Sequence, residues 1–192
     1  MKTAKEALAK SLKTLLQTRS FDEIAVKQIV LDSGVNRQTF YYHFQDKFDC
    51  LQYLFFNEAR DLIPEQILLS EWKARYLSVF RYLDVNHNFC RHVEVSSGYS
   101  QLSDFVLDCI NLIVQGMTRK VSVNAADSFG SGKDLSVLEY GLQGVIMNWF
   151  RDGLRENPTL LIDGAANFTE EQLEILLRDS QCVDKSDKVS GC

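Results

Sequence analysis

Apolar side chains recur at every third or fourth position along most of this chain. That period is the repeat of an amphipathic α-helix, whereas a half-buried strand would alternate apolar and polar residues. Only two prolines, Pro64 and Pro158, interrupt the pattern within 192 residues. The pattern therefore predicts an all-α protein, and the length allows one or two domains with a sizeable core.

Punctuating residues divide the pattern into separate helices. Residues 4–16 carry a stripe of alanine and leucine that predicts a first helix. A long helix from about residue 48 should end at Pro64, because proline cannot continue a helix. Further helices are predicted over residues 72–83, 89–95, 100–113 and 135–155, with a loop at residues 124–134. Thr169 and Gln172 have the spacing of a capping box, which predicts a last helix from Thr169.

The most informative segment is residues 26–47, VKQIVLDSGVNRQTFYYHFQDK. Gly34 stands where an apolar helix must stop, and glycine takes the left-handed conformation that ends a helix at little cost. Asn36 then suits the N-cap of a new helix over about residues 37–43. This second helix is too short to be stable alone. The segment predicts a helix-turn-helix, which places its second helix in the DNA major groove.

The exposed side chains of that second helix suit contacts with nucleic acid. Arg37 and Gln38 lie at its N-terminus, where Arg can bind a guanine edge and Gln an adenine edge through two hydrogen bonds. Hydroxyl, imidazole and ammonium groups suit phosphate oxygens, which fix register rather than sequence. The alternative, an aromatic helix that only fills a core, would bury hydroxyl groups at a high cost. The predicted DNA-binding residues are Lys27, Asn36, Arg37, Gln38, Thr39, Tyr41, Tyr42, His43 and Lys47.

The same segment resembles the N-terminal domain of TetR-family transcriptional regulators. In that family a Gly-Val turn precedes a recognition helix of the form Thr-x-Tyr-x-His-Phe, followed by x-x-Lys. The resemblance implies phosphate contacts by the Thr, Tyr, His and Lys of the pattern. Ala25 departs from it, since the family usually has a Ser or Thr cap there. The matching residues are Gly34, Val35, Thr39, Tyr41, His43, Phe44 and Lys47.

A narrower resemblance joins two distant parts of the chain. The run NRQTFYYHF at residues 36–44, together with Trp149 in GLQGVIMNWFRDGLRENP, is similar to a Firmicutes-type branch of the family. That branch includes regulators of dihydroxyacetone kinase operons.

Charge is distributed unevenly along the chain. Residues 1–47 hold eight basic and five acidic residues, a net charge of +3, whereas residues 48–192 carry a net charge of −8. A basic module on an acidic body is consistent with DNA contact at one end. We expect a DNA-binding domain at residues 1–47, a helical effector-binding and dimerisation domain at 48–182, and a disordered tail at 183–192.

The predicted helix over residues 135–155 is apolar on more than one face, so it should be buried on several sides. The family resemblance implies that this helix and the next one pair with their copies across a two-fold axis. The alternative is a central helix of a monomer. The expected dimer-interface residues are Leu142, Val145, Ile146, Trp149, Leu173, Leu176 and Leu177.

An effector that favours one spacing of the two recognition helices would couple its own binding to that of DNA. The sequence leaves open whether the effector is a small molecule or a protein. For each candidate pocket residue, plain core is favoured over contact with a ligand. The candidates are Trp72, Tyr76, Tyr82, Phe105, Cys109 and Trp149.

Other chemistries find little support in the sequence. Five cysteines without a CxxC pair indicate a reducing cytoplasm rather than a disulfide framework. His87, Cys90 and His92 lie close in sequence, but a helix would turn His92 away from the other two, so we expect no metal site. The chain has no run of about 18 apolar residues, which speaks against a membrane span. No catalytic triad or carboxylate pair indicates an enzyme, and no motif indicates a cofactor.

These observations together predict a cytoplasmic, homodimeric transcriptional regulator that binds a palindromic operator under the control of an effector. The competing hypothesis is a helical protein-interaction module that answers to a protein partner and has weak or lost DNA binding.

Overall fold

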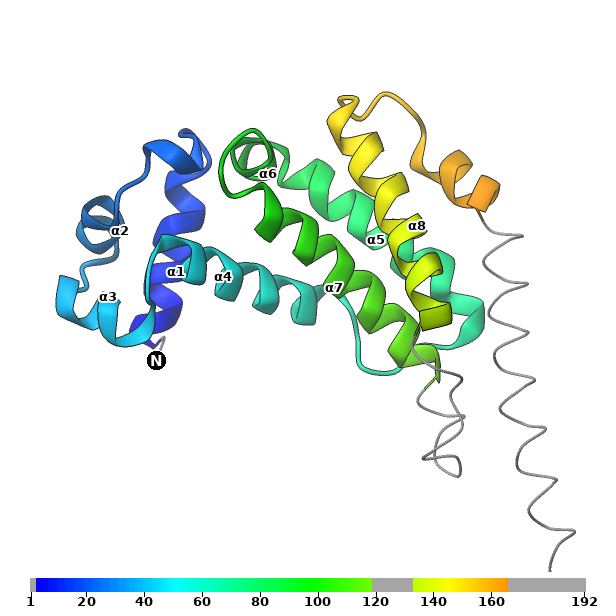
Figure 1. Cartoon of the computed structure of the whole chain (residues 1–192), viewed down its shortest axis with the longest axis horizontal. Coiled ribbons are helices and arrows are strands. Elements are labelled where there is room, and N and C mark those ends of the chain that lie inside the picture. The colour runs from blue at the N-terminus through cyan, green and yellow to red at the C-terminus, as the bar shows by residue number, and fades with distance from the viewer. Residues whose placement is uncertain (1–2, 119–132, 166–192) are drawn as a thin grey trace, which may run out of the picture. The chain divides into compact units, whose positions relative to one another are not determined.

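The computed structural model describes residues 3–118 and 133–165, and all regular secondary structure in these ranges is helical (Figure 1). The all-α prediction is confirmed. The chain forms two compact units, one of Met1–Leu62 with Arg81–Asp108 and the other of Ile63–Phe80 with Cys109–Cys192. Two helices, α5 (Trp72–Val85) and α7 (Tyr99–Thr118), contribute residues to both units.

The first unit begins with α1 (Ala4–Leu15), which a capping box starts. The Thr3 hydroxyl accepts a hydrogen bond from the Glu6 N–H, and the Glu6 carboxylate accepts one from the Thr3 N–H. Leu8 and Leu12 are fully buried on the inner face of α1, which packs on α2 (Val26–Ser33) and α4 (Lys47–Leu62). A short 3-10 helix, η1 (Phe21–Glu23), connects α1 to α2.

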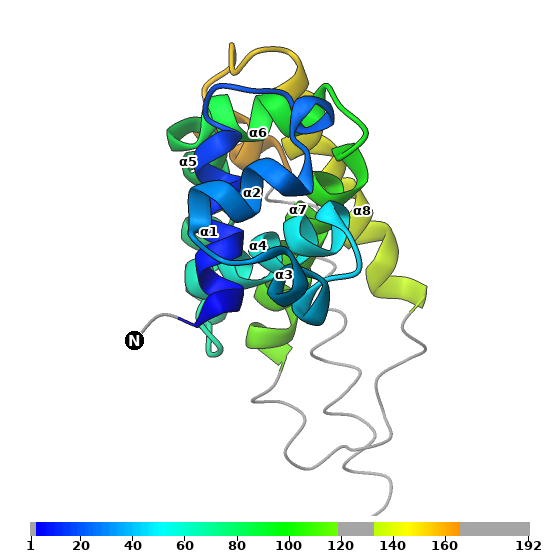
Figure 2. The ribbon, with the colours of Figure 1, turned by 90° about the vertical axis from the view of Figure 1, so that its left-hand side faces the viewer.

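The turn between α2 and α3 (Arg37–His43) has the form that the sequence predicts for a helix-turn-helix. Gly34 ends α2 with a φ of +69°, in the left-handed region. Phe40 is fully buried and anchors α3, which packs on both α1 and α2. Figure 2 shows α2 and α3 beside α1 on the face of the first unit that is turned toward the viewer.

Aromatic side chains fill the rest of the first unit, where α4 meets α6 (His87–Glu94) and the parts of α5 and α7 that belong to this unit. The Phe55 ring lies 5.3 Å from that of Phe89 and stacks on Phe105 at 5.0 Å. The Tyr82 ring lies 4.9 Å from Phe105. These contacts join four helices in one core.

The second unit packs the N-terminal part of α5 against α8 (Lys133–Arg151), after the short 3-10 helix η2 (Leu69–Glu71). The Tyr76 ring meets the edge of Phe80 at 5.3 Å, and Phe80 meets Trp149 at 4.8 Å. The Tyr76 hydroxyl donates a 2.6 Å hydrogen bond to the carbonyl of Leu142. Within residues 3–118 and 133–165, no helix combines the length and apolarity that crossing a membrane requires.

The C-terminal end of α8 differs from the prediction. The helix ends at Arg151 rather than near residue 155, because Gly153 and Leu154 take positive φ values of 79° and 61° and reverse the chain. Their N–H groups bond to the carbonyls of Phe150 and Trp149, which closes the end of the helix.

A helix that the sequence analysis missed covers residues 158–165. Pro158 takes its first position, where a missing N–H costs nothing, and the Asn157 side chain accepts a hydrogen bond from the Thr159 N–H at 3.0 Å. The predicted helix start at Thr169, the predicted tail and nearly all of the loop at residues 124–134 lie outside the described residues.

Replacing the turn glycine should destabilise the protein through the backbone alone. No atom of the described residues lies within 4 Å of a Cβ built on Gly34, so the cost comes from its positive φ. We expect Gly34→Ala to lower the free energy of unfolding by about 1 kcal/mol. Gly34→Asn should cost less, because asparagine tolerates the left-handed region. Urea unfolding followed by circular dichroism measures both, and equal losses would contradict the conformational cause.

Candidate nucleic-acid interface

The outer face of α3 presents the side chains that the sequence assigns to DNA. Arg37 and Gln38 are exposed at the N-terminus of the helix. Tyr41 is 47% exposed and Tyr42 is 84% exposed, on a helix that buries Phe40 completely. Large exposed aromatic side chains on so short a helix indicate a surface that meets a partner.

The Arg37 side chain is held along the helix by its neighbour one turn later. Its guanidinium lies 3.4 Å from the Tyr41 hydroxyl, to which it donates a hydrogen bond, and 5.5 Å from the centre of the tyrosine ring. Both residues remain exposed. The contact orders the long Arg37 side chain in advance, which lowers the entropy cost of binding a base.

Asn36 and Thr39 form a second cluster at the start of α3. The side-chain Oδ1 of Asn36 accepts hydrogen bonds from the Thr39 N–H at 2.8 Å and from the Thr39 hydroxyl at 3.0 Å. Asn36 is therefore the N-cap that the sequence predicts, and it also orients the Thr39 hydroxyl. At the other end of α3, the rings of Tyr42 and His43 meet edge to face at 5.0 Å.

The ammonium group of Lys47 is turned inward. It donates hydrogen bonds to the carbonyls of Phe21 at 2.7 Å, Ile24 at 3.0 Å and Asp22 at 3.4 Å. It also lies 4.4 Å from the centre of the Phe21 ring. Burial lowers the pKa of Lys47, although the Asp22 carboxylate raises it in part. In this structure the side chain binds backbone carbonyls, and the phosphate contact expected from the sequence stays a prediction.

Two further residues, at or near the start of α2, bear on the interface. Lys27 is exposed near the start of the helix. Ala25 precedes α2, and its methyl side chain cannot accept a hydrogen bond to cap the helix. The Gln28 side-chain oxygen accepts a 2.7 Å hydrogen bond from the Ala25 N–H, so half of a capping box remains. The signal for this contact in the sequence is a Gln three residues after the cap position.

The six candidate effector residues are divided between the two units. Tyr82 and Phe105 belong to the first unit, while Trp72, Tyr76, Cys109 and Trp149 belong to the second. All except Tyr82 are buried. Burial raises the pKa of Tyr76, whose hydroxyl is bound to the Leu142 carbonyl. Most of these side chains therefore serve as core.

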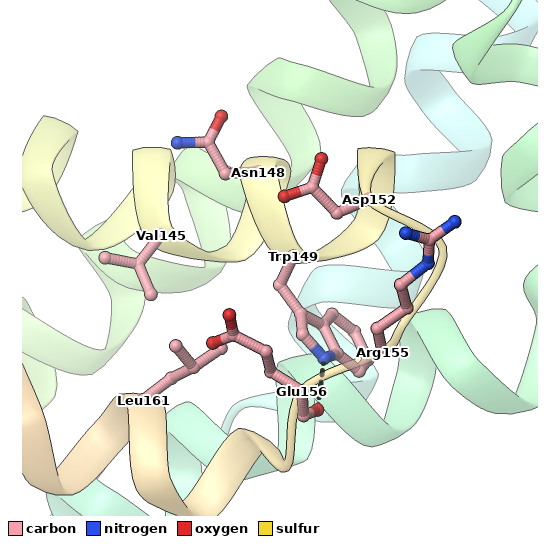
Figure 3. Close-up of a pocket in the computed structure, with 7 residues that line it drawn as sticks. All are labelled: Val145, Asn148, Trp149, Asp152, Arg155, Glu156 and Leu161. Carbon is pink, nitrogen blue, oxygen red and sulfur yellow. Dashed lines mark hydrogen bonds between the residues drawn. The ribbon is translucent and has the colours of Figure 1, made fainter.

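Trp149 lines a pocket of about 550 Å³ at the C-terminal end of α8 (Figure 3). Its indole N–H donates a 2.8 Å hydrogen bond to the carbonyl of Glu156, which ties the loop after α8 to the helix. Polar and charged side chains make up much of the lining: Asn148, Asp152, Arg155 and Glu156. Such a lining suits a small polar molecule better than an apolar one.

The expected dimer residues on α8 are divided between core and surface. Leu142, Ile146 and Trp149 are buried inside the second unit, and Val145 is half-buried. Leu173, Leu176 and Leu177 lie outside the described residues. The exposed face of α8 instead carries Val137, Tyr140, Gly141 and Asn148.

Cys50 on α4 and Cys90 on α6 are fully buried in the first unit, and His92 on α6 is half-buried. Burial raises the pKa of Cys90, and it raises that of Cys50 to about 12. His92 places Nδ1 2.8 Å from the Leu16 carbonyl. In the part of the chain that the structure describes, no three His, Cys, Asp or Glu side chains are grouped to hold a metal ion.

Comparison with known protein families gives two matches. The family model described as bacterial regulatory proteins, tetR family, matches residues 5–54. The model described as transcriptional regulator C-terminal region matches residues 70–171, which is more than half of the chain.

Individual proteins agree with these matches. The HTH-type dhaKLM operon transcriptional activator DhaS of Lactococcus lactis subsp. lactis is 33% identical over 88 residues, which cover 46% of this chain and 47% of that protein. The match therefore spans about half the length of this relative. The solved structure of the dihydroxyacetone kinase operon activator DhaS has a TM-score of 0.59 at 21% identity, covers 90% of this chain and 97% of its own, and shares the fold. The family resemblance seen in the sequence is confirmed, and this chain belongs to the TetR family of bacterial transcriptional regulators.

Proposed function

We propose that this regulator binds a palindromic DNA operator as a homodimer in the cytoplasm and that an effector controls the binding. The observation that carries the proposal is the outer face of α3, where Arg37 and Gln38 are exposed while Phe40 holds the helix in the core. One helix of seven residues contacts few bases. Two copies on half-sites about 34–36 Å apart give the affinity and the palindrome that a dimer requires.

The side chains of the interface divide into two roles. Arg37 and Gln38 read base edges, since both can form two hydrogen bonds to one base. Lys27, the hydroxyls of Thr39, Tyr41 and Tyr42, and the ring of His43 bind phosphates, which orient the protein on the duplex. Asn36 contributes by fixing the N-terminus of α3.

The exposed face of α8 is the proposed dimer interface. Val137 is 71% exposed and Tyr140 is 60% exposed, although both are large apolar side chains. A Cβ built on Gly141 or Gly144 would have no described atom within 4 Å, so this side of the helix has room for a second helix. Leu142 and Ile146 support the interface from inside the same unit.

The pocket beside Trp149 is the proposed effector site. It lies on α8, the helix assigned to the dimer, so a ligand there can favour one arrangement of the two copies. The names of the two DhaS proteins, which refer to the dhaKLM operon and to the dihydroxyacetone kinase operon, supply a first gene target. Operator sites recovered from random DNA should then be found upstream of such an operon in the source genome.

Substitutions on α2 and α3 should separate base reading from phosphate binding. We expect Arg37→Ala to relax the preference at one operator position and to cost about 1–3 kcal/mol. Lys27→Ala should weaken binding to every sequence and reduce the slope of log K against log salt by about 1. Selection from random DNA followed by fluorescence anisotropy over a salt series measures both effects.

The unmodified chain is the reference for these measurements. Selection of no palindrome by the unmodified chain would remove the DNA proposal and favour the protein-interaction module. If both variants bound DNA as tightly as the unmodified chain does, the DNA-contacting surface would have to lie outside α2 and α3.

A charge on the exposed face of α8 should disrupt the dimer. We expect Tyr140→Glu to weaken dimerisation by about 2 kcal/mol, roughly 30-fold. A tyrosine that becomes buried when two proteins associate is a common anchor of interfaces. Analytical ultracentrifugation over a concentration series measures the change. Val85→Glu is a matched control, since Val85 is 84% exposed on α5. If Tyr140→Glu dimerised as tightly as the unmodified chain does, the interface would have to lie elsewhere.

A further inference from the structure

Residues 21–24, which comprise η1 and the residue after it, are held from two sides by distant parts of the first unit. On one side lies Lys47, the first residue of α4. On the other side lies the turn between α6 and α7, at residues 96–98. The segment thus lies between the residue that follows the recognition helix and the start of α7.

The contacts of Lys47 use all the hydrogen-bond donors of its side chain. An ammonium group has three N–H donors, and three carbonyls of residues 21–24 accept from it. A phosphate could take over only by displacing hydrogen bonds that the positive charge strengthens. Lys47 begins α4 only four residues after α3 ends at His43. Its position therefore influences where the C-terminal end of α3 lies.

Asp22 binds the turn between α6 and α7. Its two carboxylate oxygens each accept a hydrogen bond from the Ser97 N–H at 3.2 Å, and one of them also accepts from the Ser97 hydroxyl. These bonds hold the pKa of the Asp22 carboxyl below its usual value, the Ser97 hydroxyl having the largest effect and Lys47 a smaller one.

The backbone of the next residue, Gly98, packs closely against the same segment. A Cβ at this position would lie 3.1 Å from the Phe21 ring and 3.1 Å from the Leu51 side chain, which is tighter than ordinary contact. The turn is therefore fitted closely to residues 21 and 22. The fit does not rest on the Asp22 hydrogen bonds alone.

We propose that Lys47 is a positioning residue for operator recognition rather than a phosphate ligand, and that Asp22 and Ser97 link its position to the start of α7. The backbone carbonyl of Asp22 accepts a hydrogen bond from Lys47, and its carboxylate accepts one from the Ser97 N–H. A single residue therefore connects the two contacts. A shift of the turn between α6 and α7 is transmitted through residues 21–24 to the first turn of α4. This inference rests on the proposed DNA binding.

Lys47 variants distinguish positioning from phosphate binding. The probes are the palindrome recovered by selection and an unrelated duplex of equal length, each measured over a salt series. We expect Lys47→Met to bind the palindrome about tenfold more weakly, to bind the unrelated duplex nearly as the parent does, and to keep the parental salt slope. Lys47→Arg should not restore binding, because a planar guanidinium does not match three carbonyls around an ammonium.

Lys27→Met is the matched control, because Lys27 is exposed on α2 and is assigned to phosphate. It should weaken binding to both probes alike and reduce the salt slope by about 1. The positioning role is wrong if Lys47→Met behaves like Lys27→Met, or if Lys47→Arg restores binding.

Asp22 tests the link to α7 and covers the case in which Lys47→Met does not fold. Asp22 is exposed, so Asp22→Ala should fold, and we expect several-fold weaker binding to the palindrome. Asp32→Ala removes an equal charge from the exposed surface of α2 and should not weaken binding. The Asp22→Ala, Lys47→Met double variant should lose less affinity than the two single losses combined, because both act through one segment.

Three outcomes are distinct. Additive losses, or parental binding by Asp22→Ala, would overturn the link while leaving the proposed function intact. Failure of the parent chain to select any palindrome would instead overturn the proposed function itself.

Discussion

The interface depends on how a helix of seven residues is held, since so short a helix is not stable alone in water. Asn36 caps its start, Phe40 is fully buried at its centre, and Phe44 is 2% exposed just after its end. The Phe40 and Phe44 rings lie 5.6 Å apart, so both anchor to the same core. The direction of every DNA-facing side chain on α3 follows from this burial, which makes the core of the first unit part of the binding site.

The charge available for DNA is smaller than the count of basic residues suggests. Residues 1–47 hold eight lysines and arginines, but Lys47 binds carbonyls inside the unit. Lys13 forms a 2.8 Å salt bridge with Glu58, and Lys5 lies 4.2 Å from the centre of the Tyr53 ring. A diffuse basic surface would bind any duplex through its charge alone. With several cations turned to the protein itself, recognition rests more on the ordered side chains of α3, such as Arg37 held by Tyr41.

The sequence predicted what depends on local signals and missed what depends on distant backbone. The α2–α3 turn was predictable because Gly34 and Asn36 carry distinctive conformational preferences. The partners of Lys47 were not, because every residue has a carbonyl and nothing in the sequence marks those of residues 21–24. The early end of α8 was also hidden, since Leu154 takes a positive φ that branched side chains rarely adopt. The aromatic residues offered as effector-pocket candidates are mostly buried, as large apolar rings usually are, and their contact with an effector stays a prediction.

The apolar character of α8 has two explanations that the structure separates. Leu142, Ile146 and Trp149 are buried within their own unit, so most of the hydrophobicity that suggested a partner is satisfied inside one chain. The remaining surface is narrow, with two glycines beside Val137 and Tyr140. An interface built on it would depend on close approach of backbones rather than on many large side chains. Trp149 belongs to α8, and its side chain contacts Phe80 and also lines the pocket. A ligand that moved Trp149 would therefore change the packing that sets the position of α8, and in this way the proposed effector would be coupled to the proposed dimer.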